Sequence, residues 1–321
     1  MRIILHGDIK TARVVLAVLC VFTISTVLQN SNKMKSTKGL PQQQEQLKER
    51  REPRLGDGCY NIYLDVGANV GVHGRFLFEP EKYQSSWHSV ALFAREYGKV
   101  RDNRNYCVFE FEANSKHWPR LRQISDSYAQ MGWRYHVIEA AVSDEEGNTP
   151  FFHQGTADKK SNEWGFSGAT SFNQIGGWEV NVSTIRLSQW INHHIHERIV
   201  PKQTYNIATT RTTPILGMKM DIEGFEYVVM PDLIHSNSIC KFDFFFGEFH
   251  SRFAPIRQFR ENKDNGDTYH RVSLATKEET LLYEADLTKI MQTSRRCPVR
   301  WLAIDDESYL HDEQPLPNSM S

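Results

Sequence analysis

The sequence predicts a doubly wound α/β fold, in which a mainly parallel sheet is covered by helices on both faces. After residue 58, short apolar runs rich in β-branched and aromatic residues alternate with longer segments of helical character, which is the element order of such a sheet. The first run, residues 62–66, leads directly into a glycine-rich turn, LDVGANVG at residues 64–71. Turns of this kind make room for a nucleotide-like ligand at the carboxyl ends of parallel strands.

The remaining elements follow from the same alternation. We expect strands at residues 62–66, 106–111, 135–140, 184–187, 216–222, 242–249 and 300–304. We expect helices at residues 86–97, 119–131, 188–199, 223–235 and 277–293. Residues 75–84 and 154–180 fit neither pattern. We expect the first to be an inserted loop, and the second, which is rich in glycine and aromatic residues, to be a loop that recognises the substrate.

The N-terminal 58 residues are predicted to lie outside the globular domain. A short tail, residues 1–13, precedes an apolar run at residues 14–28, which we interpret as an uncleaved signal anchor spanning the membrane. A cleaved signal peptide is the alternative, and the domain would then be secreted. Residues 29–58 are polar and predict a flexible stem. This order predicts a single-pass type II membrane protein whose domain, residues 59–321, faces the lumen of the endoplasmic reticulum or Golgi.

The composition narrows the possible partners and the compartment. The 321 residues carry a formal net charge of −1 and are 40% hydrophobic, which supports a large core and gives no indication of a nucleic-acid partner. Four cysteines follow the apolar run: Cys59, Cys107, Cys240 and Cys297. They suit disulfides in an oxidising compartment, with three possible pairings, and buried free thiols fit equally well. Asn181 opens an Asn-Val-Ser glycosylation sequon, which matters only in a lumenal domain.

The glycine turn and the second strand supply the candidate ligand-binding residues. The turn lacks the G-x-G-x-x-G spacing of dinucleotide-binding folds and the Gly-Lys-Ser/Thr ending of a P-loop. We expect Gly67, Asn69 and Gly71 to let the backbone approach a ligand closely. The second strand ends in Glu110 and Glu112, and an acid there can accept both hydroxyl groups of a ribose. Glu112 lies nearer the strand end and is the better candidate, although a carboxylate without a ligand role is common there.

A later strand carries the first candidate catalytic residues. In the segment KMDIEGFE, residues 219–226, the charged residues Lys219 and Asp221 interrupt an otherwise apolar strand. Burying charges is costly, so these residues either pair with one another or face a ligand. Glu223 and Glu226 follow, and their simplest interpretation is a favourable interaction with the helix dipole. We expect Asp221 to lie at the carboxyl ends of the strands, beside the ligand.

The next strand ends in Glu248 and His250. His250 could act as a general base, because the imidazole pKa is near neutrality. A carboxylate–histidine contact that only fixes a loop explains the pair equally well. A helix over residues 188–199 would bring only His193 and His196 together and supply no third ligand, so we predict no metal site there.

Taken together, these segments resemble the FkbM family of S-adenosylmethionine-dependent methyltransferases. The matching segments are LDVGANVG (64–71), VFEFEAN (108–114), AAVSDEEG (140–147), TIRLSQWI (184–191), KMDIEGFE (219–226) and GEFH (247–250). Ala113 stands where the family usually has proline, and the insertion after Gly71 resembles that of longer eukaryotic members. The resemblance implies a class I, Rossmann-like methyltransferase sheet of seven strands, the seventh antiparallel and supplied by residues 300–304 or their neighbours.

The resemblance also implies S-adenosyl-L-methionine as the cofactor. Its methionine part would lie on the turn that Asp65 begins, with Asp65 as an organiser of the turn or a partner of the ammonium group. Its ribose would contact Glu112. Residues 140–144, which include Ala141 and Val142, would flank the adenine.

The leading functional hypothesis is O-methylation of a hydroxyl group on a glycan or small molecule. Asp221, Glu248 or His250 could remove the proton of the acceptor hydroxyl, and a divalent metal held by carboxylates is the alternative mode of activation. A type II Golgi glycosyltransferase would share the tail, anchor and stem, but the chain has no Asp-x-Asp sequence. A non-catalytic protein that keeps the fold and binds a nucleotide-like ligand is the third possibility.

Overall fold

The computed structural model describes residues 51–153, 165–168, 178–202, 213–250, 256–263, 266–273, 277–293, 297, 299–304, 312 and 314–317. Residues Arg54–Ser321 form one compact unit, and nearly all of the other unit, Met1–Pro53, is outside the described residues. The predicted tail, anchor and most of the stem therefore cannot be compared with the structure. Among the helices that the structure does describe, none has the length and apolar character needed to cross a membrane.

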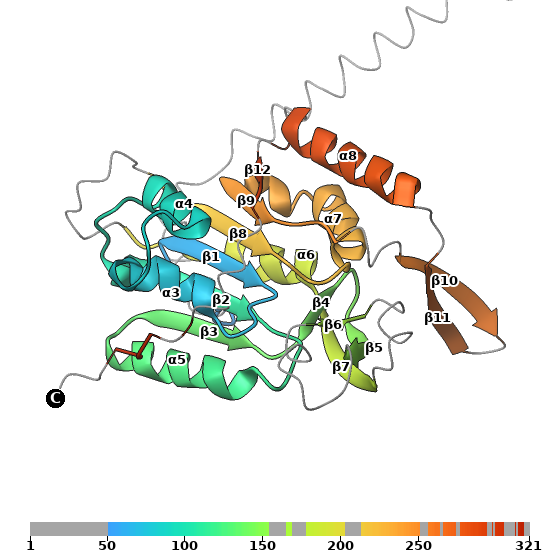
Figure 1. Cartoon of the computed structure of the whole chain (residues 1–321), viewed down its shortest axis with the longest axis horizontal. Coiled ribbons are helices and arrows are strands. Elements are labelled where there is room, and N and C mark those ends of the chain that lie inside the picture. Colours follow the sequence, from blue (N-terminus) through green and yellow to red (C-terminus); the bar gives the residue numbers. More distant parts are fainter. Residues whose placement is uncertain are drawn as a thin grey trace, which may run out of the picture. The chain divides into compact units, whose positions relative to one another are not determined.

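A six-stranded parallel sheet forms the centre of the unit (Figure 1). Its strands, in spatial order, are β12 (Arg300–Ala303), β9 (Phe244–Gly247), β8 (Leu216–Met220), β1 (Asn61–Val66), β2 (Tyr106–Phe111) and β3 (Arg134–Ile138). Every neighbouring pair is parallel. The order reverses after β1, which places the crevice for a ligand beside the carboxyl ends of β1 and β8.

The sheet confirms the predicted Rossmann-like α/β fold and corrects one strand. We expected a seventh, antiparallel strand near residues 300–304, but β12 pairs parallel to β9, and six strands form this sheet in the described part of the chain. The connection explains the direction. Helix α8 (Lys277–Thr293) lies between β9 and β12 and contacts β12, and a helical crossover returns the chain to the sheet in the same direction.

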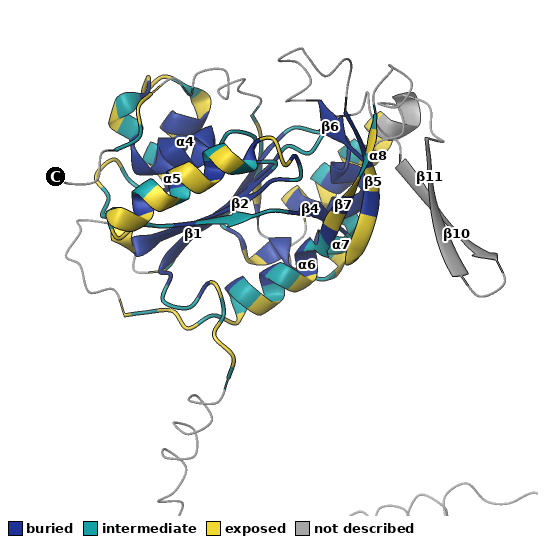
Figure 2. Ribbon diagram, turned by 90° about the horizontal axis from the view of Figure 1, so that it is seen from below, coloured by how far each residue is buried: buried dark blue, intermediate teal, exposed yellow. Residues whose placement is uncertain are grey.

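Helices cover both faces of the sheet, and each face has its own apolar core (Figures 1 and 2). On one face lie α3 (Val72–Phe78), α4 (His88–Glu96) and α5 (Trp118–Gln130). On the other lie α6 (Leu187–Trp190), the π-helical turn η6 (Ile191–His196), α7 (Glu226–His235) and α8. Alternate strand residues point to opposite faces: Tyr63 packs in the first core, whereas Ile62 and Leu64 pack in the second.

Helix α3 occupies part of the segment that we expected to be an inserted loop, residues 75–84, so that prediction was wrong. The helix begins directly after Gly71, and its apolar residues Val72 and Phe76 are buried. Arg75 obscured the apolar pattern, because it too is fully buried. Its guanidinium group pairs with Glu79 and Asp312 and donates to C-terminal carbonyl groups. A short 3-10 turn, η2 (Pro80–Lys82), completes this segment.

A second sheet lies beside the carboxyl end of β3. Its strands, in spatial order, are β4 (Ala141–Ser143), β7 (Glu179–Arg186), β5 (Gly147–His153) and β6 (Phe166–Ser167). The strand predicted at residues 184–187 therefore belongs to this sheet and not to the main one. Most of the aromatic segment at residues 154–180 is outside the described residues, apart from β6 and the start of β7.

The four cysteines outside the N-terminal apolar run form two disulfides, Cys59–Cys107 and Cys240–Cys297. The sequence left three pairings and the free thiols open, and the structure selects this pairing. The first disulfide joins the start of the unit to β2, and the second joins η7 (Ile239–Lys241) to the segment before β12. A hairpin of β10 (Ile256–Lys263) and β11 (Gly266–Ser273) completes the described elements, together with the short turn η3 (Asn103–Asn105).

Candidate active site

A pocket opens at the carboxyl ends of β1, β2, β8 and β9, where the predicted site residues converge. It encloses about 960 Å³ when its opening to solvent is included. Its lining comes from the glycine turn, from the ends of β2, β8 and β9, and from the second sheet. The predicted residues that line it are Gly67, Asn69, Glu112, Ala141, Val142, Lys219, Asp221, Glu248 and His250.

The glycine turn reverses sharply over the end of β2. The backbone N–H groups of Gly67 and Ala68 both donate to the Phe111 carbonyl oxygen, at 3.0 Å each. Gly67 has a φ of 85°, and a Cβ atom at this position would clash with the Asp221 carbonyl oxygen. The turn therefore requires glycine both for its conformation and for its close approach to β8.

Glu112 is buried at the end of β2 and lines the pocket. Its two carboxylate oxygens accept from the backbone N–H groups of Asn69 at 2.6 Å and Asn114 at 2.7 Å. Burial raises the pKa of Glu112, and His117 and the two N–H donors partly oppose this effect. Each oxygen has a second lone pair, so the fixed carboxylate can still accept hydroxyl groups from the pocket.

The second sheet makes the pocket apolar on one side. Ala140, Ala141 and Val142 line it, together with Phe151 of β5 and Phe166 of β6. Phe225, which precedes α7, also lines the pocket, and its ring lies 5.4 Å from that of Phe151. A planar aromatic ligand would find small residues and aromatic rings at this end of the pocket.

The side chain of Lys219 supplies a polar part of the pocket lining between β1 and β8. Its Nζ atom donates to the Gly67 carbonyl oxygen at 3.1 Å and lies 3.3 Å from Asp221 and 3.6 Å from Asp65. Asp65 is fully buried and is not among the residues that line the pocket. Of its two predicted roles, this position favours the organiser of the turn over a direct contact with a ligand.

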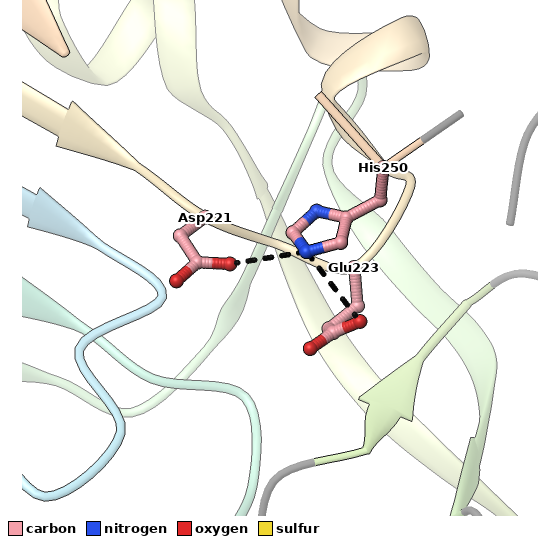
Figure 3. A group of neighbouring side chains, drawn as sticks. All are labelled: Asp221, Glu223 and His250. Carbon is pink, nitrogen blue, oxygen red and sulfur yellow. Dashed lines mark ion pairs between the residues drawn. The ribbon is translucent and has the colours of Figure 1, made fainter. Parts of the chain in front are cut away.

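His250 lies at the centre of four carboxylates, and Figure 3 shows two of them, Asp221 and Glu223. Its Nδ1 atom is 3.0 Å from Glu226. Its Nε2 atom is 2.8 Å from Glu248, 3.6 Å from Asp221 and 3.8 Å from Glu223. Burial alone would lower the pKa of His250, but Glu226, Glu248 and Glu223 outweigh it and raise the pKa to about 12. In this environment the ring retains its proton at neutral pH, which favours the neighbouring carboxylates as proton acceptors.

Besides Asp65, two predicted ligand residues lie away from the pocket. A Cβ atom added at Gly71 would clash with Tyr135 and Leu121 of the core, and Gly71 is not among the lining residues. Glu110 is fully buried under α3 and is also absent from the lining. Burial and the neighbouring Asp65 raise the pKa of Glu110 well above its usual value. Glu110 therefore belongs to the packing beneath the turn.

Several lining residues were missed in the sequence. His73 and His117 line the pocket, although each lies in or beside a helix where no local pattern marked it. Phe151 is on a strand that was not predicted. Glu223 was interpreted as a helix N-terminal acid, but α7 begins only at Glu226, and Glu223 lies in the preceding turn with a φ of 55°. Its place two residues after Asp221 was the signal that could have identified it.

A parallel sheet, a glycine turn and an acid at the tip of the adjacent strand define the class of Rossmann-like methyltransferases. The family model of the methyltransferase FkbM domain matches residues 65–269. The chain therefore belongs to the FkbM methyltransferase family, as the sequence motifs predicted. Neither the curated proteins nor the solved structures contain a significant match to the chain.

Proposed function

We propose that this protein is an S-adenosyl-L-methionine-dependent O-methyltransferase whose acceptor is a hydroxyl group on a glycan or small molecule. The observation that carries the proposal is Glu112, an acid held by two backbone N–H groups at the tip of β2 and facing a pocket beside the glycine turn. Family membership supports the reaction class. The nature of the acceptor is supported only by the family and by the compartment that the sequence predicts.

The pocket suits the parts of this cofactor in order. Glu112 would hold the ribose hydroxyl groups, and the apolar end at Ala141, Val142 and Phe151 would hold the adenine. The methionine part would lie against Gly67 and Asn69, whose turn has no Gly-Lys-Ser/Thr sequence for a pyrophosphate. When bound, the cofactor supplies a methyl group on a positively charged sulfur, which is already activated for displacement.

The chain itself must position the acceptor and remove its proton. Holding two reactants in line contributes about 7–11 kcal/mol to such reactions. Burial alone would raise the pKa of Asp221, but Lys219 and His250 hold it below its usual value, so this carboxylate is ionised at neutral pH. Asp221 and Glu248 both line the pocket. Either can accept the proton of a hydroxyl group placed there.

Calorimetric titration of the full-length protein with S-adenosylhomocysteine tests the proposal. We expect saturable binding that is weakened at least tenfold by Glu112→Gln, because the substitution replaces a carboxylate oxygen by an amide N–H₂ group that cannot accept a hydroxyl hydrogen. The matched control is Glu146→Gln, which removes an exposed carboxylate outside the pocket and should bind normally. Equal binding by the wild-type protein and the Glu112→Gln variant would contradict the assignment of the ribose site.

A further inference from the structure

Three side chains at the carboxyl ends of the strands bring together atoms that can bind a metal ion. These are Asp221 after β8, Glu223 in the turn before α7, and His250 after β9 (Figure 3). One carboxylate or imidazole atom from each lies within 4.8 Å of the others. Within the described residues, no other group of three such side chains meets this criterion. A fourth possible ligand atom, an oxygen of Glu248, lies 2.8 Å from His250 Nε2.

The opposite side of the imidazole ring is already held in the way that metal-ligating histidines are held. His250 Nδ1 is 3.0 Å from Glu226 Oε1. Glu226 is itself fixed, because its two carboxylate oxygens accept from the backbone N–H groups of Ile222 and Gly224, at 2.8 Å each. A carboxylate on one ring nitrogen fixes the tautomer and directs the lone pair of the other nitrogen toward a metal. Glu226 itself is not a member of the cluster and contacts the other nitrogen of the ring.

The carboxylates around Nε2 of His250 outnumber the hydrogen atoms that this nitrogen can donate, although Lys219 also pairs with Asp221. Three carboxylates, from Glu248, Asp221 and Glu223, lie within 3.8 Å of this one nitrogen. The nitrogen carries at most one hydrogen, so at most one of the three can accept a short hydrogen bond from it. Like charges held this close repel one another. A single divalent cation would attract all three at once.

We propose that Asp221, Glu223 and His250, with Glu248, form a binding site for one divalent transition-metal cation such as Mn²⁺. The donor set selects the class of ion. Carboxylate oxygens suit Mg²⁺, Ca²⁺ and Mn²⁺, whereas an imidazole nitrogen suits transition metals. An ion that accepts both kinds of ligand fits the site best.

The site has a role that rests on the proposed function. Asp221, Glu223, Glu248 and His250 all line the pocket that would hold the cofactor, so the cation would be exposed to an acceptor in the same pocket. A divalent cation lowers the pKa of a hydroxyl group that binds to it. His250 would lose its Nε2 proton and act as a ligand, and the oxygen of Asp221 or Glu248 that does not bind the cation would receive the proton of the acceptor hydroxyl group. The binding of the metal itself does not depend on methyl transfer.

The test measures metal binding by full-length protein in the absence of any cofactor. Protein freed of metal by chelation is titrated with Mn²⁺, and the free ion is followed by electron paramagnetic resonance. We expect one saturable ion per chain. Asp221→Asn and His250→Gln should each weaken Mn²⁺ binding at least tenfold. The control variant Glu146→Gln, which changes an exposed residue outside the pocket, should bind Mn²⁺ as the wild type does. Zn²⁺ is titrated in competition, and displacement of Mn²⁺ from the same site would also support the proposal.

Two further measurements distinguish loss of metal binding from loss of folding, and failure of the metal site from failure of the proposed function. Asp221→Asn keeps the shape of the side chain and leaves Lys219 its hydrogen bond to the Gly67 carbonyl oxygen, so the variant should remain folded, which its circular dichroism and melting temperature check. If wild-type protein binds neither ion at 1 mM, or if both variants bind as the wild type does, the metal site is overturned and Nε2 simply shares a proton with Glu248. If the ion binds but S-adenosylhomocysteine does not, the metal site stands and the proposed function fails. If S-adenosylhomocysteine binds but the metal ion does not, the proposed function stands and the metal site fails.

Discussion

At the scale of single residues, Glu110 shows how closely a structural acid and a ligand-binding acid can resemble each other in sequence. Both Glu110 and Glu112 follow the apolar part of β2, and both are buried. Only Glu112 faces the pocket. Glu110 lies opposite Asp65 in the parallel register of β1 and β2, and Tyr135 and Lys219 also face it.

The environment of Glu110 predicts a pH-dependent effect of Glu110→Gln. The folded-state pKa is raised by burial and by Asp65, so the folded protein binds a proton that the unfolded chain loses above a pKa of about 4.3. Stability contributed by Glu110 is therefore complete below that pH and falls as the pH rises toward the folded-state value. Glutamine does not titrate and resembles the neutral acid.

Urea unfolding of the wild-type protein and the Glu110→Gln variant between pH 5 and pH 8 checks this prediction. The stability of the variant relative to the wild type should increase with pH, by at most about 1.4 kcal/mol per pH unit. A difference that stays constant across this range would show that Glu110 is ionised in the folded protein.

Individual residues were predictable where a strand end placed them. Lys219 lies near the end of β8, Glu112, Asp221, Glu248 and His250 follow apolar strands, and parallel strands bring their carboxyl ends to one edge. The aromatic side of the pocket was not predictable in this way. Its rings come from separate segments of the chain, and only the packing of the second sheet against the turn before α7 brings them together.

At the scale of elements, the glycine turn joins β1 to α3 and also approaches β8. Its conformation predicts that Gly67→Ala will be damaging, because alanine resists a φ of 85° and its Cβ atom would meet the Asp221 carbonyl oxygen. We expect a loss of more than about 1 kcal/mol in the free energy of unfolding and weaker S-adenosylhomocysteine binding. Denaturant unfolding and calorimetry provide the two measurements.

Gly132→Ala is the matched control for this substitution. Gly132 has a similar φ of 71°, but an added Cβ atom there would contact nothing within 4 Å. Gly132→Ala should lower the free energy of unfolding by only about 1 kcal/mol, the conformational cost of alanine at this φ, and should leave ligand binding unchanged. Equal effects of the two substitutions on binding would show that the close approach of the turn to β8 has no importance for the site.

The main-sheet strands and most helices were predicted because their apolar periods are strong. Helix α3 was missed because Arg75 is buried, and one of its ion-pair partners, Asp312, lies far away in the sequence. The predicted direction of β12 was wrong, because the sequence of a strand does not reveal whether the neighbouring strand runs parallel to it. The predicted helix at residues 188–199 forms as α6 followed by the π-helical turn η6, and hydrophobic spacing does not separate these two forms.

At the scale of the whole molecule, two disulfides connect elements distant in the sequence. Such bonds persist in oxidising compartments, which supports our proposal that the domain is lumenal. The proposal predicts that Asn181, exposed on β7, carries a glycan when the full-length chain is made in eukaryotic cells. Endoglycosidase treatment should lower the apparent mass, and Asn181→Gln should abolish that change. An unmodified chain with reduced cysteines would contradict the lumenal location.

The central claim is that the pocket between the glycine turn and the second sheet binds S-adenosylmethionine. Calorimetric titration of the wild-type protein, with S-adenosylhomocysteine and with a panel of sugar nucleotides in parallel, tests this claim most directly. We expect one molecule of S-adenosylhomocysteine bound per chain and no saturable heat from the sugar nucleotides. Selective binding of a sugar nucleotide, or no binding of S-adenosylhomocysteine, would contradict it.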